Sequence, residues 1–162
     1  MLFRSQGYVS SPEELTLLYQ CPAQALLQTE GRIYKKAYVL KGPRNAGKSS
    51  YLEILSRTIG TENISGESLQ GLSERFSLAS LEGKILNVYD DLDKESLKYT
   101  GLFKKLTGGE EHIIERKRQT RYKAVLTAVH VFSANELPQI AEKDAEAFWG
   151  RWEIIIFSQT FQ

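Results

Sequence analysis

The sequence has 162 residues, of which 41% are apolar and 25% are charged, and its formal net charge is +1. This length suits one ordinary domain, with enough apolar residues for a core around one sheet. The charge balance excludes a histone-like or acidic-tail protein, so any contact with nucleic acid requires a local basic patch. The lone cysteine, Cys21, excludes an internal disulfide, and two histidines make a zinc cluster implausible.

Residues 1–36 are expected to form a helical lead-in. Ser11, Pro12, Glu13 and Glu14 combine an N-cap, a proline at the first helical position and acids in the first turn. A second short helix is expected over 23–28, after Pro22. The first ten residues lack the basic start and apolar run of a signal peptide, and no segment is long enough to span a membrane as a helix. A cytosolic location inside the cell is therefore expected.

The chain from residue 37 to 162 alternates short apolar segments with helical patterns. Core strands are expected at 37–40, 63–64, 85–89, 129–132 and 153–157, and helices at 49–59, 69–81, 95–106 and 141–149. Two further β-type segments, near 112–115 and 122–127, flank a polar basic stretch and predict a hairpin. The pattern predicts an α/β fold with a mostly parallel sheet flanked by helices and an inserted basic β-hairpin.

A glycine-bearing loop follows the first apolar strand and leads into a helix. It fits the pattern of a glycine, any four residues, and then Gly-Lys-Ser, and consists of Gly42, Pro43, Arg44, Asn45, Ala46, Gly47, Lys48 and Ser49. Such a loop points backbone N–H groups at an anion, to which the following helix adds its positive end. We predict a P-loop in which Lys48 reaches the β- and γ-phosphates and the Ser49 hydroxyl binds Mg²⁺.

Two acids end the apolar segment 85–89. A magnesium-bound triphosphate needs an acidic partner at the end of a neighbouring strand, and Asp90 and Asp91 meet that need. We expect Asp90 to hold Mg²⁺, through water, and Asp91 to orient or deprotonate the attacking water. Taken alone, the two acids also suit a simple exit from a strand into a turn.

Asn135 and Arg151 each allow two interpretations. Asn135 follows the strand at 129–132, where its amide suits contact with a γ-phosphate oxygen and water, or alternatively the capping of a turn before Pro138. Arg151 lies between Trp149 and Trp152, where it suits an arginine finger or ordinary stacking on tryptophan. The residues alone favour packing for Arg151.

Five cations lie within eight residues of the expected hairpin, without an acid among them: Arg116, Lys117, Arg118, Arg121 and Lys123. A basic loop between two strands can contact a nucleic-acid backbone, and Tyr122 adds a stacking surface. A solvated turn explains the same charges equally well.

Several of these segments, in this order, resemble the superfamily 3 helicase domain of phage, plasmid and viral primase-helicases. Besides the loop at 42–49, they are Asn-Val-Tyr-Asp-Asp-Leu-Asp at 87–93, Thr-Gly-Gly-Glu at 107–110, Ser-Ala-Asn-Glu-Leu-Pro at 133–138 and Phe-Trp-Gly-Arg-Trp at 148–152. The resemblance covers roughly residues 37–157.

The resemblance implies an ATP-hydrolysing, AAA+-like helicase core over 37–162 that forms a homo-oligomer, usually a hexameric ring, with ATP and Mg²⁺ between subunits. Lys48 and Ser49 then match the Walker A residues, Asp90 and Asp91 the Walker B acids, and Asn135 the γ-phosphate sensor. Arg151 matches the arginine offered to a neighbouring subunit, and the basic hairpin around Lys117 the element that faces single-stranded or forked DNA. Such domains usually follow a primase and an oligomerisation region, so a primase partner or a longer parent chain is expected.

Two other classes remain open. A small-molecule kinase has this size and a P-loop, but needs an arginine-rich lid, and the one arginine-rich stretch leads into the 129–132 strand. A non-catalytic nucleotide-binding or DNA-binding subunit is the third class.

Overall fold

A computed structural model of the chain describes residues 9–27, 34–92, 100–138, 140 and 145–161. Its centre is a five-stranded sheet in the order β2-β3-β6-β1-β7, in which every neighbouring pair is parallel. The strands are β1 (Ala37–Lys41), β2 (Ile64–Ser65), β3 (Leu86–Tyr89), β6 (Val129–Ala134) and β7 (Trp152–Ile156). The predicted parallel α/β architecture is therefore confirmed.

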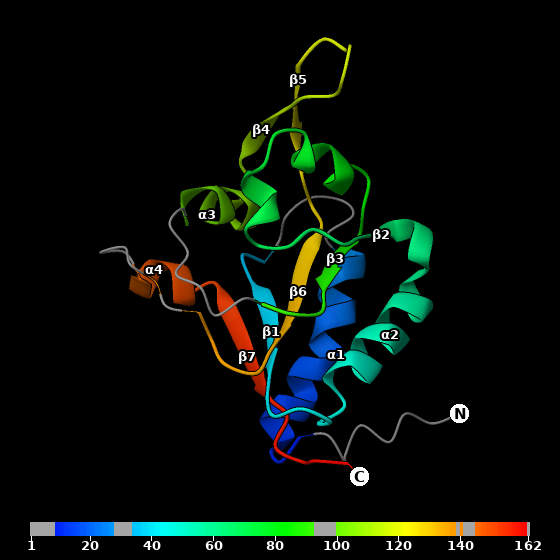
Figure 1. Cartoon of the computed structure of the whole chain (residues 1–162), viewed down its shortest axis with the longest axis vertical. Helices are drawn as coiled ribbons and strands as arrows, with labels where there is room; N and C mark the ends of the chain where they lie inside the picture. The colour runs from blue at the N-terminus through cyan, green and yellow to red at the C-terminus, as the bar shows by residue number, and fades with distance from the viewer. Residues whose placement is uncertain (1–8, 28–33, 93–99, 139, 141–144, 162) are drawn as a thin grey trace.

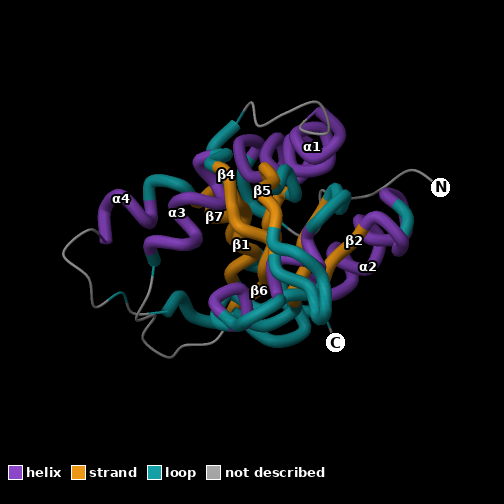
Figure 2. Tube along the Cα trace, turned by 90° about the horizontal axis from the view of Figure 1, so that it is seen from above, coloured by secondary structure: helices purple, strands orange, loops and turns teal. Residues whose placement is uncertain are grey.

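Helices cover both faces of this sheet. The helices α1 (Pro12–Leu27) and α2 (Lys48–Ile59) lie on one side, and α3 (Gly101–Gly108) and α4 (Ala145–Trp149) lie on the other (Figures 1 and 2). Alternate residues of β1 enter two separate apolar clusters: Tyr38 and Leu40 join the cluster under α1 and α2, whereas Ala37 and Val39 join the other. Burial on both faces explains why these strands read as continuous apolar runs rather than alternating ones.

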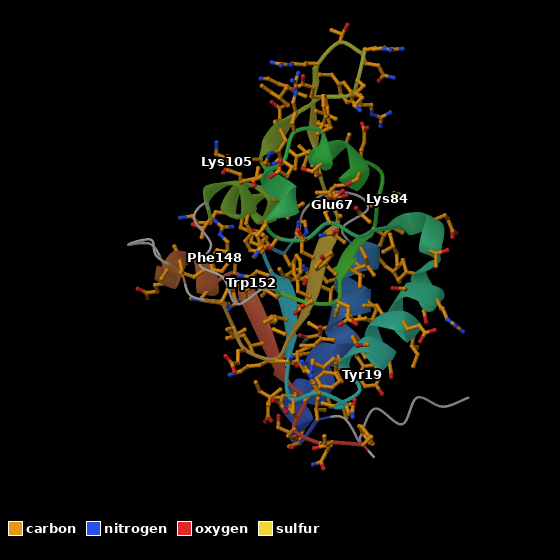
Figure 3. The ribbon with its side chains drawn as sticks, viewed as in Figure 1. Tyr19, Glu67, Lys84, Lys105, Phe148 and Trp152 are labelled. Carbon is orange, nitrogen blue, oxygen red and sulfur yellow. The ribbon has the colours of Figure 1, made fainter. Side chains whose placement is uncertain are left out.

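The second cluster is rich in aromatic rings. Phe103 of α3 stacks on Trp152 of β7 with ring centroids 4.7 Å apart, and Phe148 of α4 lies 5.7 Å from the same tryptophan (Figure 3). These contacts fix α3 and α4 against the start of β7, directly beside Arg151.

The lead-in differs from the expectation, because α1 is one helix that continues through Pro22 rather than two short ones. A proline has no N–H, so the carbonyl of Leu18, four residues earlier, loses its helical partner. The Tyr51 hydroxyl of α2 donates a hydrogen bond to that carbonyl at 2.6 Å. The tertiary contact therefore replaces the missing bond and lets the helix continue.

Three other expected elements differ in extent. The segment 69–81 forms two short 3₁₀ turns, η4 (Gly71–Ser73) and η5 (Ser77–Leu81), instead of a helix; a third, η3 (Thr61–Asn63), precedes β2. The α3 helix includes Thr107 and Gly108 and ends at Gly109, which adopts a left-handed conformation at φ 74°. Residues 93–99 and 141–144, expected to begin the helices before Leu106 and Trp149, lie outside the described residues.

The strands β4 (Glu111–Ile114) and β5 (Tyr122–Val125) form a separate antiparallel pair. They project at the top of Figure 1, at the end of the molecule opposite the loop that leaves β1. None of the helices that the structure describes combines the length and apolar character needed to cross a membrane.

We predict that Tyr51→Phe lowers the free energy of unfolding by about 1–3 kcal/mol, because it leaves the buried Leu18 carbonyl without a partner. The Pro22→Ala variant supplies a backbone N–H at that position, so Tyr51→Phe should cost at most about 1 kcal/mol in the Pro22→Ala background. Denaturant unfolding of the four proteins measures both costs. An equal cost in the two backgrounds would contradict the assigned role of the tyrosine.

Candidate functional site

The loop 42–47 joins β1 to α2 and contains two residues in the left-handed region. Asn45 has φ 58° and Gly47 has φ 87°. Gly47 immediately precedes the helix, and its carbonyl accepts the first helical bond, from the Tyr51 N–H at 3.0 Å. The first N–H groups of a helix have no partner within the helix, and this is the feature with which an anion-binding loop holds its ligand.

Gly42 begins the loop in a position that admits no side chain. A Cβ placed there would lie 2.2 Å from the carbonyl oxygen of Phe157, the residue that directly follows β7. Its N–H donates to the Ala134 carbonyl at 3.1 Å, so Gly42 lies between the ends of two strands. The glycine thus lets β7 pack directly against the first turn of the loop.

A cleft of about 500 Å³ opens at the carboxyl ends of β1, β3 and β6. It is lined by Arg44, Asn45, Ala46, Gly47, Lys48, Ser49, Ser50, Asp90, Asp91, Ser133 and Asn135. The structure therefore brings the predicted loop, both acids and Asn135 to one place. Carboxyl ends of strands in an open parallel sheet are where ligands bind in such folds.

Lys48 is 8% exposed, and its ammonium lies at the floor of this cleft. Its Nζ donates to the carbonyls of Gly42 and Pro43 at 2.7 and 2.6 Å, and to Asn135 Oδ1 at 3.1 Å. Burial lowers the pKa of Lys48 from its ordinary value, and the charge of Asp90 acts in the opposite direction. The loop carbonyls thus hold the only amine in the cleft lining in a fixed position.

Ser133 is a cleft residue that our sequence interpretation missed. It is 4% exposed, and its Oγ donates to Asp90 Oδ1 at 2.5 Å. Side chains on a strand alternate between the two faces, so Val131, Ser133 and Asn135 lie on the α2 side of the sheet. The two-residue spacing between Ser133 and Asn135 was the available signal.

The oxygen donors in the cleft fit Mg²⁺. The Ser49 hydroxyl and the Asp90 carboxylate line the same space, and both are oxygen ligands of the kind that this ion prefers. Within the described residues, no cluster of three or more acidic, histidine or cysteine side chains forms a protein-only cage. This arrangement suits an ion that takes most of its ligands from phosphate and water.

Arg151 lies at the opposite edge of the sheet. It immediately precedes β7, whose first residue pairs with Ala37 at the start of β1, whereas the loop leaves the end of β1. A strand of this length separates the two edges by roughly 16 Å. The Arg151 guanidinium donates to Thr107 Oγ1 at 3.3 Å, so it contacts the last turn of α3 rather than the cleft of its own chain.

The hairpin cations divide into two groups. Arg116 pairs with Glu82, Arg121 with Glu115 at 3.1 Å and Lys123 with Glu111 at 3.6 Å, although no acid interrupts the basic stretch in sequence. Glu82 also accepts a bond from the Tyr122 hydroxyl at 2.5 Å. Lys117 and Arg118 are exposed at the turn, and neither takes part in an ion pair between described residues.

Residues 40–151 match the model of a protein family that is described as a family of unknown function, DUF5906. The chain belongs to this family. The match runs from the end of β1 through Arg151, so it includes the loop, both acids and the hairpin. No curated protein gives a significant match.

Solved structures share the fold at low sequence identity. The apo NrS-1 C-terminal region (A form) matches 93% of this chain with a TM-score of 0.65 and 16% identity, and JCV helicase matches 93% with 0.59 and 19%. An inhibitor-bound JCV helicase gives 0.56 and 18%. This chain spans only 38–41% of these structures, and the likeness shows a helicase-like fold.

We predict that Gly42→Ala lowers the free energy of unfolding by about 1–3 kcal/mol, because the new methyl group meets the Phe157 carbonyl. Gly101→Ala is the matched control, since a Cβ at this position in α3 has nothing within 4 Å. The control should leave stability unchanged or raise it by up to about 1 kcal/mol. Equal stability of the two variants by denaturant unfolding would show that the close approach at Gly42 is unimportant.

Proposed function

We propose that this chain is the ATP-hydrolysing core of a superfamily 3 DNA helicase, a P-loop NTPase of AAA+ type that acts as a homo-oligomeric ring, usually hexameric. The observation that carries the proposal is the single cleft in which Lys48, Ser49, Asp90 and Asn135 meet from three adjacent strand ends. The likeness to the fold of JCV helicase supports the same class. The motor works inside the cell on single-stranded or forked DNA.

The cleft residues divide the chemistry of phosphoryl transfer among them. Backbone N–H groups of 44–49 surround the phosphates, and Lys48 offsets charge on the β- and γ-phosphates. Ser49 and Asp90 would hold Mg²⁺, which would offset the negative charge of the phosphates. Asp91 orients or deprotonates the attacking water. The Asn135 amide, which holds Lys48 through Oδ1, has its Nδ2 donors available for a γ-phosphate oxygen.

Arg151 completes the cleft of a neighbouring subunit. Its side chain lies at the far edge of the sheet from its own loop, roughly 16 Å away. A head-to-tail interface, in which one surface of each subunit meets a different surface of the next, closes into a ring. Arg151 of one subunit then faces the γ-phosphate held by Lys48 of the next, where an arginine stabilises charge in the transition state.

The hairpin supplies the contact with DNA, mainly through its turn. Of the five predicted cations, Lys117 and Arg118 are available to phosphate, whereas Arg116, Arg121 and Lys123 must first exchange their carboxylate partners. The proposal includes a primase partner, or a primase region elsewhere in a longer chain, which the resemblance in sequence implies.

We predict that Lys48→Ala and Arg151→Ala each reduce ATP hydrolysis at least about 10³-fold, measured with single-stranded DNA over a range of protein concentrations. In an equimolar mixture of the two variants, about a quarter of the sites combine an intact Lys48 with an intact Arg151 from the neighbouring subunit. ATP hydrolysis should therefore return in the mixture. Arg57→Ala, an exposed arginine paired with Glu53 on α2, is the control and should hydrolyse ATP normally.

No recovery in the mixture, together with activity that is linear in protein and indifferent to DNA, would contradict a ring motor. The small-molecule kinase would then be the better explanation. Absence of hydrolysis in the unaltered chain, with retained ATP binding, would favour the non-catalytic subunit.

We predict that the double variant Lys117→Ala/Arg118→Ala binds a fluorescein-labelled single-stranded oligonucleotide more weakly, and that its logarithmic salt slope falls by about 1.4, or 0.7 for each lost phosphate contact. Fluorescence anisotropy over a salt series measures both quantities. Lys35→Ala/Arg57→Ala removes the same charge elsewhere and should change neither. Arg116→Ala should weaken oligonucleotide binding less than the Lys117→Ala/Arg118→Ala variant does, because Glu82 already neutralises this arginine. Equal oligonucleotide affinities and salt slopes for the Lys117→Ala/Arg118→Ala and Lys35→Ala/Arg57→Ala variants would exclude the hairpin turn as the DNA contact.

A further inference from the structure

Ser133 fastens the acidic turn after β3 to the central strand β6. The last register pair between these strands is Tyr89 with Phe132, so Asp90 lies just beyond the paired region. Ser133 continues the attachment twice: its Oγ donates to Asp90 Oδ1 at 2.5 Å, and its carbonyl accepts the Leu92 N–H at 2.6 Å. Both bonds fall within a turn of three residues, so the position of Asp90 depends on Ser133.

We propose that Ser133 is a positioning residue that orients the Asp90 carboxylate toward a Mg²⁺–nucleotide. This role rests on the proposed function. The hydroxyl uses one carboxylate oxygen in a charge-assisted hydrogen bond and thereby fixes the rotation of the group. The second oxygen, Oδ2, is then presented to the cleft that Ser49 also lines.

Ser133 also keeps Asp90 separate from Lys48. Both side chains line the cleft, yet they form no ion pair among the described residues. Without the serine hydroxyl, the carboxylate would lose its neutral donor, and Lys48 is the buried cation of the same cleft. Direct pairing of Asp90 with Lys48 would neutralise the groups that the ion and the phosphates require.

The alternation of side chains along β6 brings the Ser133 hydroxyl to the cleft. Ala134 is buried in the opposite cluster, so the strand presents Ser133 and Asn135, but not the residue between them, to the cleft. The two residues hold charges of opposite sign: Ser133 holds the acid and Asn135 the lysine. The alternation of β6 thereby sets the separation of the two charged groups.

The test compares Ser133→Ala, Ser133→Thr and Ser133→Val by the affinity for a fluorescent N-methylanthraniloyl ATP, titrated with Mg²⁺ and measured separately in EDTA. Threonine and valine have nearly the same shape, so only the hydroxyl distinguishes them and a packing defect affects both. The Ser65→Ala control removes another buried strand serine, whose hydroxyl bonds Ser80 away from the cleft. Thermal unfolding confirms that each variant is folded.

Ser133→Ala and Ser133→Val should need at least about tenfold more Mg²⁺ for half-maximal enhancement of binding, with unchanged affinity in EDTA. Ser133→Thr and Ser65→Ala should match the unaltered chain. Equal Mg²⁺ dependence of the threonine and valine variants would overturn the role of Ser133 while leaving the nucleotide site intact. Failure of the unaltered chain to bind the nucleotide at all would instead overturn the proposed function, and this role with it.

Discussion

The central position of β6 is the constraint on which the site depends. β6 pairs with β1 on one side and with β3 on the other, so it separates the strand that leads into the loop from the strand that leads into the acids. With β6 between them, a cleft remains, and the polar side chains of β6 line its floor.

Strand direction imposes the second constraint. All five strands of the main sheet are parallel. The segments that follow the strands therefore lie at the carboxyl ends of the sheet, and the segments that precede them lie at the amino ends. The loop, the acids and Asn135 follow their strands, whereas Arg151 precedes β7 and the hairpin precedes β6. Arg151 therefore lies at the opposite ends of the strands from its own loop, and the proposed action of this arginine on a phosphate involves a second copy of the chain.

The sequence predicted the strands and the loop well because both depend on local signals. Continuous apolar runs mark buried parallel strands, and the spacing of Gly42, Gly47 and Lys48 marks the loop. Four features of the structure were not predicted from the sequence, and each depends on a contact between residues distant in sequence. The continuation of α1 through Pro22 needs Tyr51, the role of Ser133 needs Asp90, the pairing of Arg116 needs Glu82, and the strand order follows from packing. Local patterns contain none of this information.

The hairpin illustrates how tertiary contacts change the meaning of a charge run. Glu82 lies in the segment before β3, yet it binds both Arg116 and Tyr122 and so connects the hairpin to the segment that leads into β3. Exposed ion pairs of this kind stabilise a fold only slightly, and a phosphate can therefore replace a carboxylate at little cost. If the proposed function holds, the acids of the chain compete with DNA phosphates for these cations. Under the proposed function, Lys117 and Arg118 at the turn would contact DNA first, and Arg116 and Arg121 would then exchange their carboxylate partners for phosphates.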